Sequence, residues 1–315
     1  MTLSQDIKHK AIELGFDLVG ITDASPIDSR HIERLNIWLQ SGCAGQMSYM
    51  SRNFEKRTHP AKLLDNAQSV ICVALNYKPP KQKPNDTTTP TGKVASYAQY
   101  EDYHPFIKER LRILTEFICS IGGQEHKFKI CVDSVPLAER SLAARAGLGF
   151  IGKNHMLINP TFGPQIFLGE IITTLKLSTD KPITDNCSDC DKCIQACPTQ
   201  ALMPNGKFDA NKCISYLTIE YDGSITSELA QKTADLIFGC DKCVLACPYQ
   251  TNAPACKNKL FKLYNNRLNL NLNWILNLTQ QEFDTEFADS TIKRSGLERL
   301  KRNAQICLDN INSSS

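Results

Sequence analysis

The spacing of apolar residues predicts helices and strands in alternation over the first 180 residues. Apolar side chains three and four positions apart are typical of helices, and short continuous apolar runs are typical of strands. The predicted helices span 7–14, 106–121 and 136–146, and the predicted strands span 16–22, 69–77 and 128–133. Because strands that alternate with helices favour an α/β arrangement, we expect a first domain at residues 1–180.

The pattern changes after residue 180. Residues 181–256 contain few long periodic stretches and many cysteines, which is typical of a small domain in which metal clusters replace much of the core. Residues 257–315 return to apolar spacings of three and four, so we predict a C-terminal helical segment there. Prolines, lysines and threonines between residues 78 and 92 predict a surface loop.

Composition narrows the class of protein. The 315 residues are 42% hydrophobic, which is enough for a sizeable core. No apolar run approaches the roughly 18 residues of a membrane-spanning helix, so we expect no membrane association. The N-terminal residues are polar and include no apolar signal segment, so we expect a reducing, cytoplasmic location. The net charge of +3 permits an anionic partner without requiring one.

Eight of the fourteen cysteines fall into two runs. The first run is Cys-x2-Cys-x2-Cys-x3-Cys-Pro, and the second repeats it with its first cysteine displaced to Cys213. In ferredoxins with two 4Fe-4S clusters, the fourth cysteine of each run binds the other cluster. On that rule, the ligands of one cluster are Cys187, Cys190, Cys193 and Cys247. The ligands of the other cluster are Cys197, Cys213, Cys240 and Cys243.

Two structural zinc sites with four cysteine ligands each are the main alternative, because they also use Cys-x2-Cys pairs. Zinc ribbons separate the two pairs by a longer spacer. Here three cysteines lie within seven residues, and a proline follows the fourth cysteine in both runs. Iron–sulfur clusters are therefore the favoured interpretation. The six other cysteines lie mostly among apolar residues, and we predict that they are core thiols or incidental ones.

The segment 147–154 contains two nucleotide-binding patterns that do not fit their surroundings. Its glycines match G-x-G-x-x-G, but a dinucleotide site needs a strand before the glycines, and here a predicted helix precedes them. The segment also matches most of a P-loop, but Asn154 replaces the Ser or Thr that binds magnesium. We therefore predict the end of a helix followed by a turn.

Asp133 stands at the end of a predicted strand and just before a predicted helix. α/β proteins often place side chains that contact a ligand at this position. Asp133 or Ser134 would equally serve as the cap of that helix, because both side chains accept hydrogen bonds from the first backbone N–H groups of a helix. The pattern of residues leaves both roles open.

Several segments together resemble the epoxyqueuosine reductase family. Besides the cysteine runs, they are Arg57-Thr-His-Pro60, Ser96-Tyr97-Ala98 with Asp102-Tyr103-His104, Val132 to Arg140, Gly147 to Asn154 and Gly163 to Glu170. The resemblance covers nearly the whole chain. It implies a nitroreductase-like cobalamin-binding domain, similar to that of reductive dehalogenases, at 1–180. A two-cluster ferredoxin-like domain would follow at 181–256, and a short C-terminal helical segment at 257–315.

The resemblance also implies an activity, the reduction of epoxyqueuosine to queuosine at the wobble position of tRNAs with GUN anticodons. The implied cofactors are cobalamin and two 4Fe-4S clusters, and the implied electron donor is an external flavodoxin or ferredoxin system acting on a monomer. Asp133 would give a proton to the opening epoxide, and burial beneath the corrin would have to raise its pKa. The residues expected at the corrin are Arg57, Tyr97, Asp133, Asn154, His155, Ile158, Gly169 and Ser215.

Two further features bear on the cofactor and the RNA. His104 belongs to a near match to the Asp-x-His-x-x-Gly cobalamin signature, but Ile107 replaces the glycine, so we do not expect His104 to bind cobalt. Basic residues are modestly concentrated at 78–93 and 293–302, and solvated charge is the usual explanation of such runs. Stacking of RNA bases and core packing are both open for Tyr216, Tyr221 and Tyr249.

Other functions remain as alternatives. A cobalamin-dependent, dehalogenase-like reductase of a small molecule would share the cofactors, but the N-terminal residues show no twin-arginine signal. A non-catalytic iron–sulfur electron carrier would not need a domain of 180 residues before its clusters. An iron–sulfur protein that binds RNA without catalysis would not need cobalamin.

Overall fold

The computed structural model describes residues 2–81 and 89–313. Part of the surface loop predicted at 78–92 lies outside the described residues. The helices are α1 (Leu3–Glu13), α2 (Ser29–Gln40), α3 (Tyr49–Arg52), α4 (Phe54–Thr58), α5 (Tyr103–Gly122), α6 (Glu139–Arg145), α7 (Lys192–Gln195), α8 (Ile214–Ile219), α9 (Ser227–Thr233), α10 (Lys242–Leu245), α11 (Pro248–Thr251), α12 (Leu272–Asn277), α13 (Gln280–Glu286) and α14 (Leu297–Ser313). The strands are β1 (Leu18–Asp23), β2 (Ser69–Asn76), β3 (Thr91–Val94), β4 (Phe128–Cys131), β5 (Phe150–Ile151), β6 (Leu157–Ile158), β7 (Ile166–Thr173), β8 (Leu236–Phe238) and β9 (Asn269–Asn271). Short 3₁₀ turns are η1 (Pro60–Lys62), η2 (Ser96–Gln99), η3 (Ala210–Lys212), η4 (Asn265–Arg267) and η5 (Thr291–Ser295).

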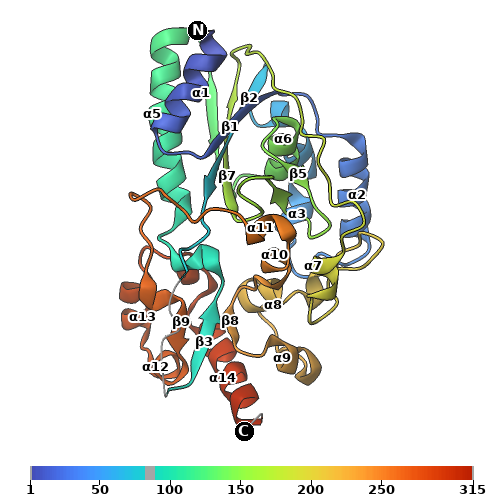
Figure 1. The fold of residues 1–315 in the computed structure, drawn as a ribbon, viewed down its shortest axis with the longest axis vertical. Coiled ribbons are helices and arrows are strands. Elements are labelled where there is room, and N and C mark those ends of the chain that lie inside the picture. Colours follow the sequence, from blue (N-terminus) through green and yellow to red (C-terminus); the bar gives the residue numbers. More distant parts are fainter. Residues whose placement is uncertain (1, 82–88, 314–315) are drawn as a thin grey trace.

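A four-stranded sheet forms the upper half of the molecule (Figure 1). Its strand order is β1-β2-β7-β4, and every neighbouring pair is antiparallel. The helices and strands predicted over the first 180 residues are confirmed as α1, α5, α6, β1, β2 and β4. Alternation of elements does not reveal strand direction, and the antiparallel pairing makes this part of the chain α+β in type.

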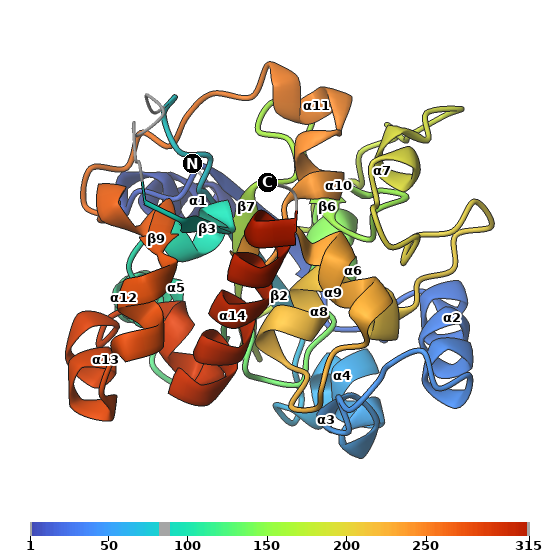
Figure 2. The same ribbon diagram turned by 90° about the horizontal axis from the view of Figure 1, so that it is seen from below.

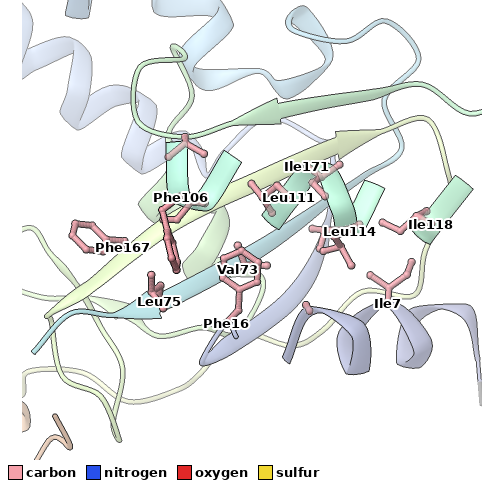
Figure 3. Packing of buried hydrophobic residues seen from close by; sticks show 14 of the residues in the cluster. Ile7, Phe16, Val73, Leu75, Phe106, Leu111, Leu114, Ile118, Phe167 and Ile171 are labelled. Carbon is pink, nitrogen blue, oxygen red and sulfur yellow. The ribbon is translucent and has the colours of Figure 1, made fainter. Parts of the chain in front are cut away.

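Helices α1 and α5 cover one face of this sheet (Figure 3). Ile71, Val73 and Leu75 of β2 point toward this face, since alternate residues of a strand share a face. On α5, the apolar residues recur at spacings of three and four, and Leu111 and Leu114 are fully buried against the sheet. The result is the main hydrophobic core.

Helix α6 covers the opposite face of the sheet, against Val70, Cys72 and Ala74 of β2. Because apolar side chains cover both faces, β2 is buried along its whole length. The continuous apolar run from which β2 was predicted is the pattern of a strand with two covered faces. Helix α6 follows the loop that contains Asp133, so its packing fixes one end of that loop.

A second sheet joins distant parts of the chain. Strand β3 pairs in parallel with β8 and antiparallel with β9, which gives the order β8-β3-β9. Helices α12, α13 and α14 pack around it in the lower half of the molecule, as seen from below in Figure 2. The C-terminal segment is therefore largely helical, as predicted, but it also contributes the strand β9. The division into three domains at 180 and 256 remains a prediction.

The glycine-rich segment after α6 forms a turn and a hairpin. Helix α6 ends at Arg145, and Gly147 follows with φ +81°, a left-handed conformation that favours glycine. The next residues form the two-stranded hairpin of β5 and β6. The prediction of a helix end followed by a turn is confirmed, and neither nucleotide-binding pattern has its required strand–glycine–helix context.

The basic stretch 293–302 is used largely for internal contacts. The Arg302 guanidinium donates hydrogen bonds to the carbonyl oxygens of Leu217, Tyr221 and Gly223, at 2.6–2.8 Å. Arg299 binds Asp222 and the Ile219 carbonyl. These two side chains fasten α14 to α8 and the residues after it.

Asn303 is the best test of this attachment. Its side chain is 2% exposed, and Nδ2 donates to the carbonyl oxygens of Thr218 and Ile237, both at 2.9 Å. The substitution Asn303→Leu leaves two buried acceptors without donors, which costs about 1–3 kcal/mol. We expect the unfolding midpoint, measured anaerobically at one scan rate, to fall by roughly 2–5 °C. Gln305→Leu on the exposed face of the same helix is the control, and an equal effect of both substitutions would contradict this role for Asn303.

Candidate functional site

The structure brings the cysteines of the two runs into two groups of four. The first thiol group consists of Cys187, Cys190, Cys193 and Cys247, which line one cavity together with Lys153, Asn154, Ile158, Pro248 and Tyr249. The cavity holds about 40 Å³, several times the space that one water-sized probe needs. Within residues 2–81 and 89–313, no group of three or more His, Cys, Asp or Glu side chains is close enough to hold a single metal ion. The four thiols of the first group thus line one shared volume, as the ligands of a cluster do.

The second thiol group consists of Cys197, Cys213, Cys240 and Cys243. After burial, the thiols of Cys240, Cys213 and Cys197 raise the pKa of Cys243, which shows that the four lie close together. The first group is coupled in the same way, since burial and then Cys187, Cys190 and Cys247 raise the pKa of Cys193. Each group thus contains cysteines from both runs, in the combination that the crossing rule predicts.

The two groups face different surroundings. The first lies at an outer cavity. The second lies toward η2, where Asp241 accepts a hydrogen bond from the Ser96 N–H at 2.6 Å. Burial and then Asp241 and Asp133 raise the pKa of Tyr97 far above its usual value. Tyr97 therefore lies within electrostatic range of both carboxylates, and its ring lies near Gly239, the residue before Cys240 of the second thiol group.

Asp133 lies at the surface, among many protein groups. Its side chain is 58% exposed, and Arg140 is exposed as well, yet burial is the largest influence on the pKa of both. From water access combined with close protein surroundings we infer that this surface is concave, and we call it the Asp133 hollow. The groups around it that interact electrostatically with Asp133 are Tyr49, Arg57, Tyr97, Tyr103, Arg140 and Glu220.

The backbone of Asp133 is held in an unusual conformation. Its φ is +51°, in the left-handed region that non-glycine residues seldom adopt. The Asp133 N–H donates to the Glu139 carboxyl at 2.5 Å. Neither Asp133 nor Ser134 caps α6, because the cap position is Ala138 and no side chain bonds there. The capping role that the sequence left open is therefore wrong. Strained backbone of the kind seen at Asp133 is concentrated at functional sites.

The Asp133 side chain is bonded to His104. Oδ2 of Asp133 lies 3.1 Å from His104 Nε2, and His104 Nδ1 lies 2.6 Å from Asp102 Oδ1. Burial acts to raise the pKa of Asp133, but the hydrogen bond and charge of His104 outweigh it, so that the pKa is lowered. The protein groups alone therefore lower the pKa of Asp133, and the rise expected beneath a corrin remains a prediction. Both nitrogens of His104 face carboxylates, which leaves no nitrogen to bind cobalt.

A second pair of acids lies beneath the Asp133 loop. Glu170 of β7 is fully buried between its strand neighbours Cys72 and Cys131, and neither carboxyl oxygen has a well-aligned partner among the described residues. Burial and then Glu139 raise the pKa of Glu170 well above its usual value. Burial and then Asp133 raise the pKa of Glu139 to about 7. At least one of these two carboxyls is therefore neutral at physiological pH.

Some of the residues predicted at the corrin gather at the hollow and at the thiol groups. Arg57 and Tyr97 line the hollow with Asp133. Asn154 and Ile158 line the cavity of the first thiol group, and Asn154 Nδ2 lies 3.4 Å from the Cys243 carbonyl oxygen.

The other predicted corrin residues lie in three different surroundings. His155 has φ +61°, and its carbonyl oxygen accepts a hydrogen bond from Arg140. The Ser215 N–H is directed at the Cys213 thiol. Gly169 lies under α5, where an added Cβ would come within 2.7 Å of the Ile107 side chain. Close packing therefore accounts for glycine at 169, and its contact with a corrin remains a prediction.

The three tyrosines near the cysteines also differ. Tyr216 is 6% exposed, its hydroxyl accepts a hydrogen bond from the Gln46 N–H at 2.7 Å, and its ring lies near Tyr221. These two rings belong to a small core. Tyr249 lines the cavity of the first thiol group beside Phe150.

Four side chains that act on Asp133 or are acted on by it were not among the predicted site residues. They are His104, Glu139, Glu170 and Arg294. The sequence held a signal for one of them, because Glu170 is an acid within an otherwise apolar strand. The role of His104 depends on a carboxylate 29 positions away, and no local pattern predicts that contact. In the part of the chain that the structure describes, no helix is long and apolar enough to cross a membrane.

Comparison with known proteins identifies two family models in the chain. The model described as "Epoxyqueuosine reductase QueG, DUF1730" matches residues 57–134. The model described as "4Fe-4S double cluster binding domain" matches residues 186–250, which include both cysteine runs.

Complete relatives extend the likeness over the chain. The epoxyqueuosine reductase of Leadbetterella byssophila is 40% identical over 305 residues, which cover 95% of this chain and 96% of that protein. The solved structure of epoxyqueuosine reductase from Streptococcus thermophilus has a TM-score of 0.91 and 30% identity, over 99% of this chain and 82% of that one. A structure of epoxyqueuosine reductase with a tRNA-Tyr epoxyqueuosine-modified stem loop also has a TM-score of 0.91 and 30% identity, over 98% of this chain and 81% of that one.

The fold, the two thiol groups and the double-cluster match define an iron–sulfur oxidoreductase with two 4Fe-4S clusters. Identity of 40% over 95% of the chain specifies its family. The chain belongs to the epoxyqueuosine reductase family. The expected fold class and family are confirmed, and the assignment of individual residues to cofactors remains a prediction.

A double substitution tests the crossed binding of the clusters. In Cys187→Ser/Cys247→Ser protein, both lost thiols belong to the first group, so we expect one intact cluster and about four irons per chain. Iron analysis and EPR of the reduced, reconstituted protein measure this. Cys187→Ser/Cys197→Ser is the matched control, because these two thiols belong to one run but to different groups, so their loss should damage both clusters. Two damaged clusters in the first variant and one intact cluster in the control would show that each run binds its own cluster.

The acid pair predicts a pH dependence of stability. An unfolded Glu titrates near 4.5, whereas Glu139 in the folded protein titrates at about 7 and Glu170 titrates well above its usual value. A raised folded pKa favours the protonated group in the fold, so its contribution is present below pH 4.5 and is lost as pH rises through 7. We expect the unfolding midpoint to fall between pH 5.5 and about 8, and to fall less in Glu170→Gln. Glu125→Gln on the exposed surface should leave the slope unchanged, and an equally steep slope in Glu170→Gln would contradict the effect.

Proposed function

We propose that this protein reduces epoxyqueuosine to queuosine at the wobble position of tRNAs with GUN anticodons, using cobalamin, two 4Fe-4S clusters and Asp133. The observation that carries the proposal is the position of Asp133. It is an exposed acid in a hollow beside the second of two thiol groups, in a chain of the epoxyqueuosine reductase family. An acid beside an electron-transfer module is the combination that reductive opening of an epoxide needs.

The reaction defines what the site must supply. Conversion of an epoxide to an alkene breaks both carbon–oxygen bonds, consumes two electrons and two protons and releases water. The two clusters pass single electrons, and the thiol groups indicate their order. Electrons enter at the first group, at the outer cavity, and leave from the second group, which lies on the side of Tyr97 and the hollow. An external flavodoxin or ferredoxin system would supply them.

The residues around the hollow fit a large polar cofactor. Arg57 Nε and His155 Nε2 are buried, and neither has a hydrogen-bond partner within the described residues. Buried polar atoms are rarely left without partners, so both indicate a ligand. We propose that Arg57, Tyr97, Asn154, His155, Ile158 and Ser215 hold cobalamin. When bound, cobalamin supplies the chemistry at carbon, because its cobalt collects single electrons and acts as a nucleophile or an electron donor.

Asp133 acts on the oxygen. As the first carbon–oxygen bond breaks, negative charge develops on oxygen, and a positioned acid that protonates it contributes about 100-fold to 10,000-fold in rate. The left-handed backbone and the bond to Glu139 fix the direction of the Asp133 side chain. The oxygen leaves as water, and solvent supplies the second proton.

The tRNA partner is supported by charge near the hollow. Arg52 and Lys56 are exposed on α3 and α4, next to Tyr49 and Arg57 of the hollow. Such side chains contact phosphates, and phosphate contacts position a nucleic acid on a protein. The epoxyqueuosine-modified stem loop bound to a relative is the same class of ligand. We propose that the protein acts as a cytoplasmic monomer.

Asp133→Asn tests the mechanism. We expect the single-turnover rate with epoxyqueuosine-containing tRNA and a low-potential reductant to fall by about 100-fold or more, because an amide is a poor proton donor. Mass analysis of the nucleosides measures queuosine, and a spectral titration should show that cobalamin binding is retained. Asp65→Asn on the exposed surface is the control. Undiminished turnover in Asp133→Asn would remove this residue from the mechanism, and no queuosine from the wild-type holoenzyme would refute the proposed substrate.

A further inference from the structure

Three side chains at the hollow form a continuous hydrogen-bonded chain, which we call the His104 triad. It consists of Asp102, His104 and Asp133. Asp102 caps the N-terminus of α5, accepting the His104 N–H at 3.0 Å, and the same oxygen lies 2.6 Å from His104 Nδ1. The other ring nitrogen lies 3.1 Å from Asp133 Oδ2. The cap of the helix thus orients the ring toward Asp133.

The geometry of the triad requires an extra proton. Neutral imidazole carries one N–H and one lone pair, so it can donate a hydrogen bond to only one of two carboxylates. The second contact would set a lone pair against a negative oxygen. Both contacts are satisfied only when the ring is doubly protonated, or when one carboxyl is itself protonated. In each case the triad holds one proton more than a neutral histidine and two carboxylates.

Asp102 is not the holder of that proton. Arg294 of η5 donates to its other oxygen at 3.1 Å. Although burial acts in the opposite direction, the hydrogen bonds from His104 hold the pKa of Asp102 at about 2. For His104, burial acts to lower the pKa, but hydrogen bonds to Asp102 and Asp133 outweigh it and raise the pKa. The charged groups that act on His104 are thus Asp102 on its own helix, Asp133 from the loop after β4, and Arg294 from η5.

The triad has one wide opening, at Asp133. His104 is 3% exposed, and Tyr103 stacks on it with the ring centres 4.0 Å apart. The Asp102 side chain is 17% exposed, whereas that of Asp133 is 58% exposed, toward the hollow. A proton held on the ring is therefore shielded from water and can leave readily only through Asp133.

We propose that His104 holds a proton in the resting enzyme and passes it from Nε2 to Asp133, which delivers it to the epoxide oxygen. The proposal rests on the proposed function. One N–H bond at His104 breaks and one O–H bond forms on the substrate, with Asp133 unchanged between start and end. His104 is left neutral, with its Nδ1–H on Asp102. Solvent restores the proton through Asp133 after the product leaves.

This assignment accounts for the low pKa of the proposed acid. A carboxylate that is ionised at rest cannot give a proton by itself, but a carboxylate beside a protonated histidine can transmit one. His104 would therefore be a catalytic proton store, and Arg294 a positioning residue that keeps Asp102 ionised and in place.

His104→Gln in the cluster- and cobalamin-loaded enzyme tests the store. Glutamine donates a hydrogen bond to Asp133 but cannot hold an additional proton, so we expect the single-turnover rate to fall on the order of 100-fold. tRNA affinity and iron content should not change, and in His104→Ala, whose short side chain leaves room for a ring, added imidazole should restore part of the rate. His126→Gln, outside the triad, is the matched control. A rate equal to that of the wild type, or a loss that imidazole does not relieve, would overturn the proposal.

Asp102→Asn gives a second readout, which does not depend on how His104→Gln folds. Asparagine is an equally good helix cap, so α5 is preserved. Loss of the carboxylate should lower the pKa of His104. In a plot of rate against pH, the decline of the rate at high pH should therefore move to lower pH by roughly one unit. A decline of the rate at the same pH as in the wild type would overturn the proposal. If Asp133→Asn retains turnover, the proposed role of Asp133 is refuted. If Asp133→Asn loses turnover but His104→Gln and Asp102→Asn behave as the wild type, only the proposed proton store at His104 is refuted.

Discussion

The grouping of thiols from both cysteine runs is the constraint on which the rest of the structure depends. Cys247 of the second run joins the first group, and Cys197 of the first run lies with the second. Neither group can form from one run alone, so residues 187–247 must fold as a unit. The same unit carries Asp241 to η2 and Glu220 to the hollow. The geometry that brings the clusters together therefore also builds one wall of the site.

Neighbouring carboxyls near the hollow are held in opposite protonation states by their surroundings. Asp133 contacts a histidine and has a lowered pKa, whereas Glu139 and Glu170 lie against each other in the interior and have raised values. Two like charges in a buried site cannot both ionise without a large cost, so a proton is retained there. Separation of pKa values among adjacent acids is a common property of sites that move protons.

Local and periodic features could be predicted from the sequence. The apolar spacings locate β2 and α5, and the cysteine spacing, through the crossing rule, predicts the composition of both thiol groups. Three features depend on tertiary contacts and could not be predicted. The contact of His104 with Asp133 joins a helix start to a loop, and it lowers the pKa of Asp133 against the effect of burial. Gly169, predicted at the corrin, is explained by the approach of α5. The order of helices and strands along the chain does not reveal that the strands of the main sheet pair antiparallel.

Strand β3 lies at the centre of the lower sheet, and this has a consequence for biosynthesis. Its partners β8 and β9 begin at residues 236 and 269, whereas β3 ends at residue 94 and leads directly into Tyr97 at the hollow. At a translation rate of about 5–20 residues per second, the synthesis of both partner strands is complete only roughly 10 to 35 seconds after that of β3. The main sheet, whose last strand ends at residue 173, can be complete well before that. The hollow is therefore among the last features of the nascent chain to assemble, and a cofactor that needs the finished hollow can enter only after nearly all of the chain has been made.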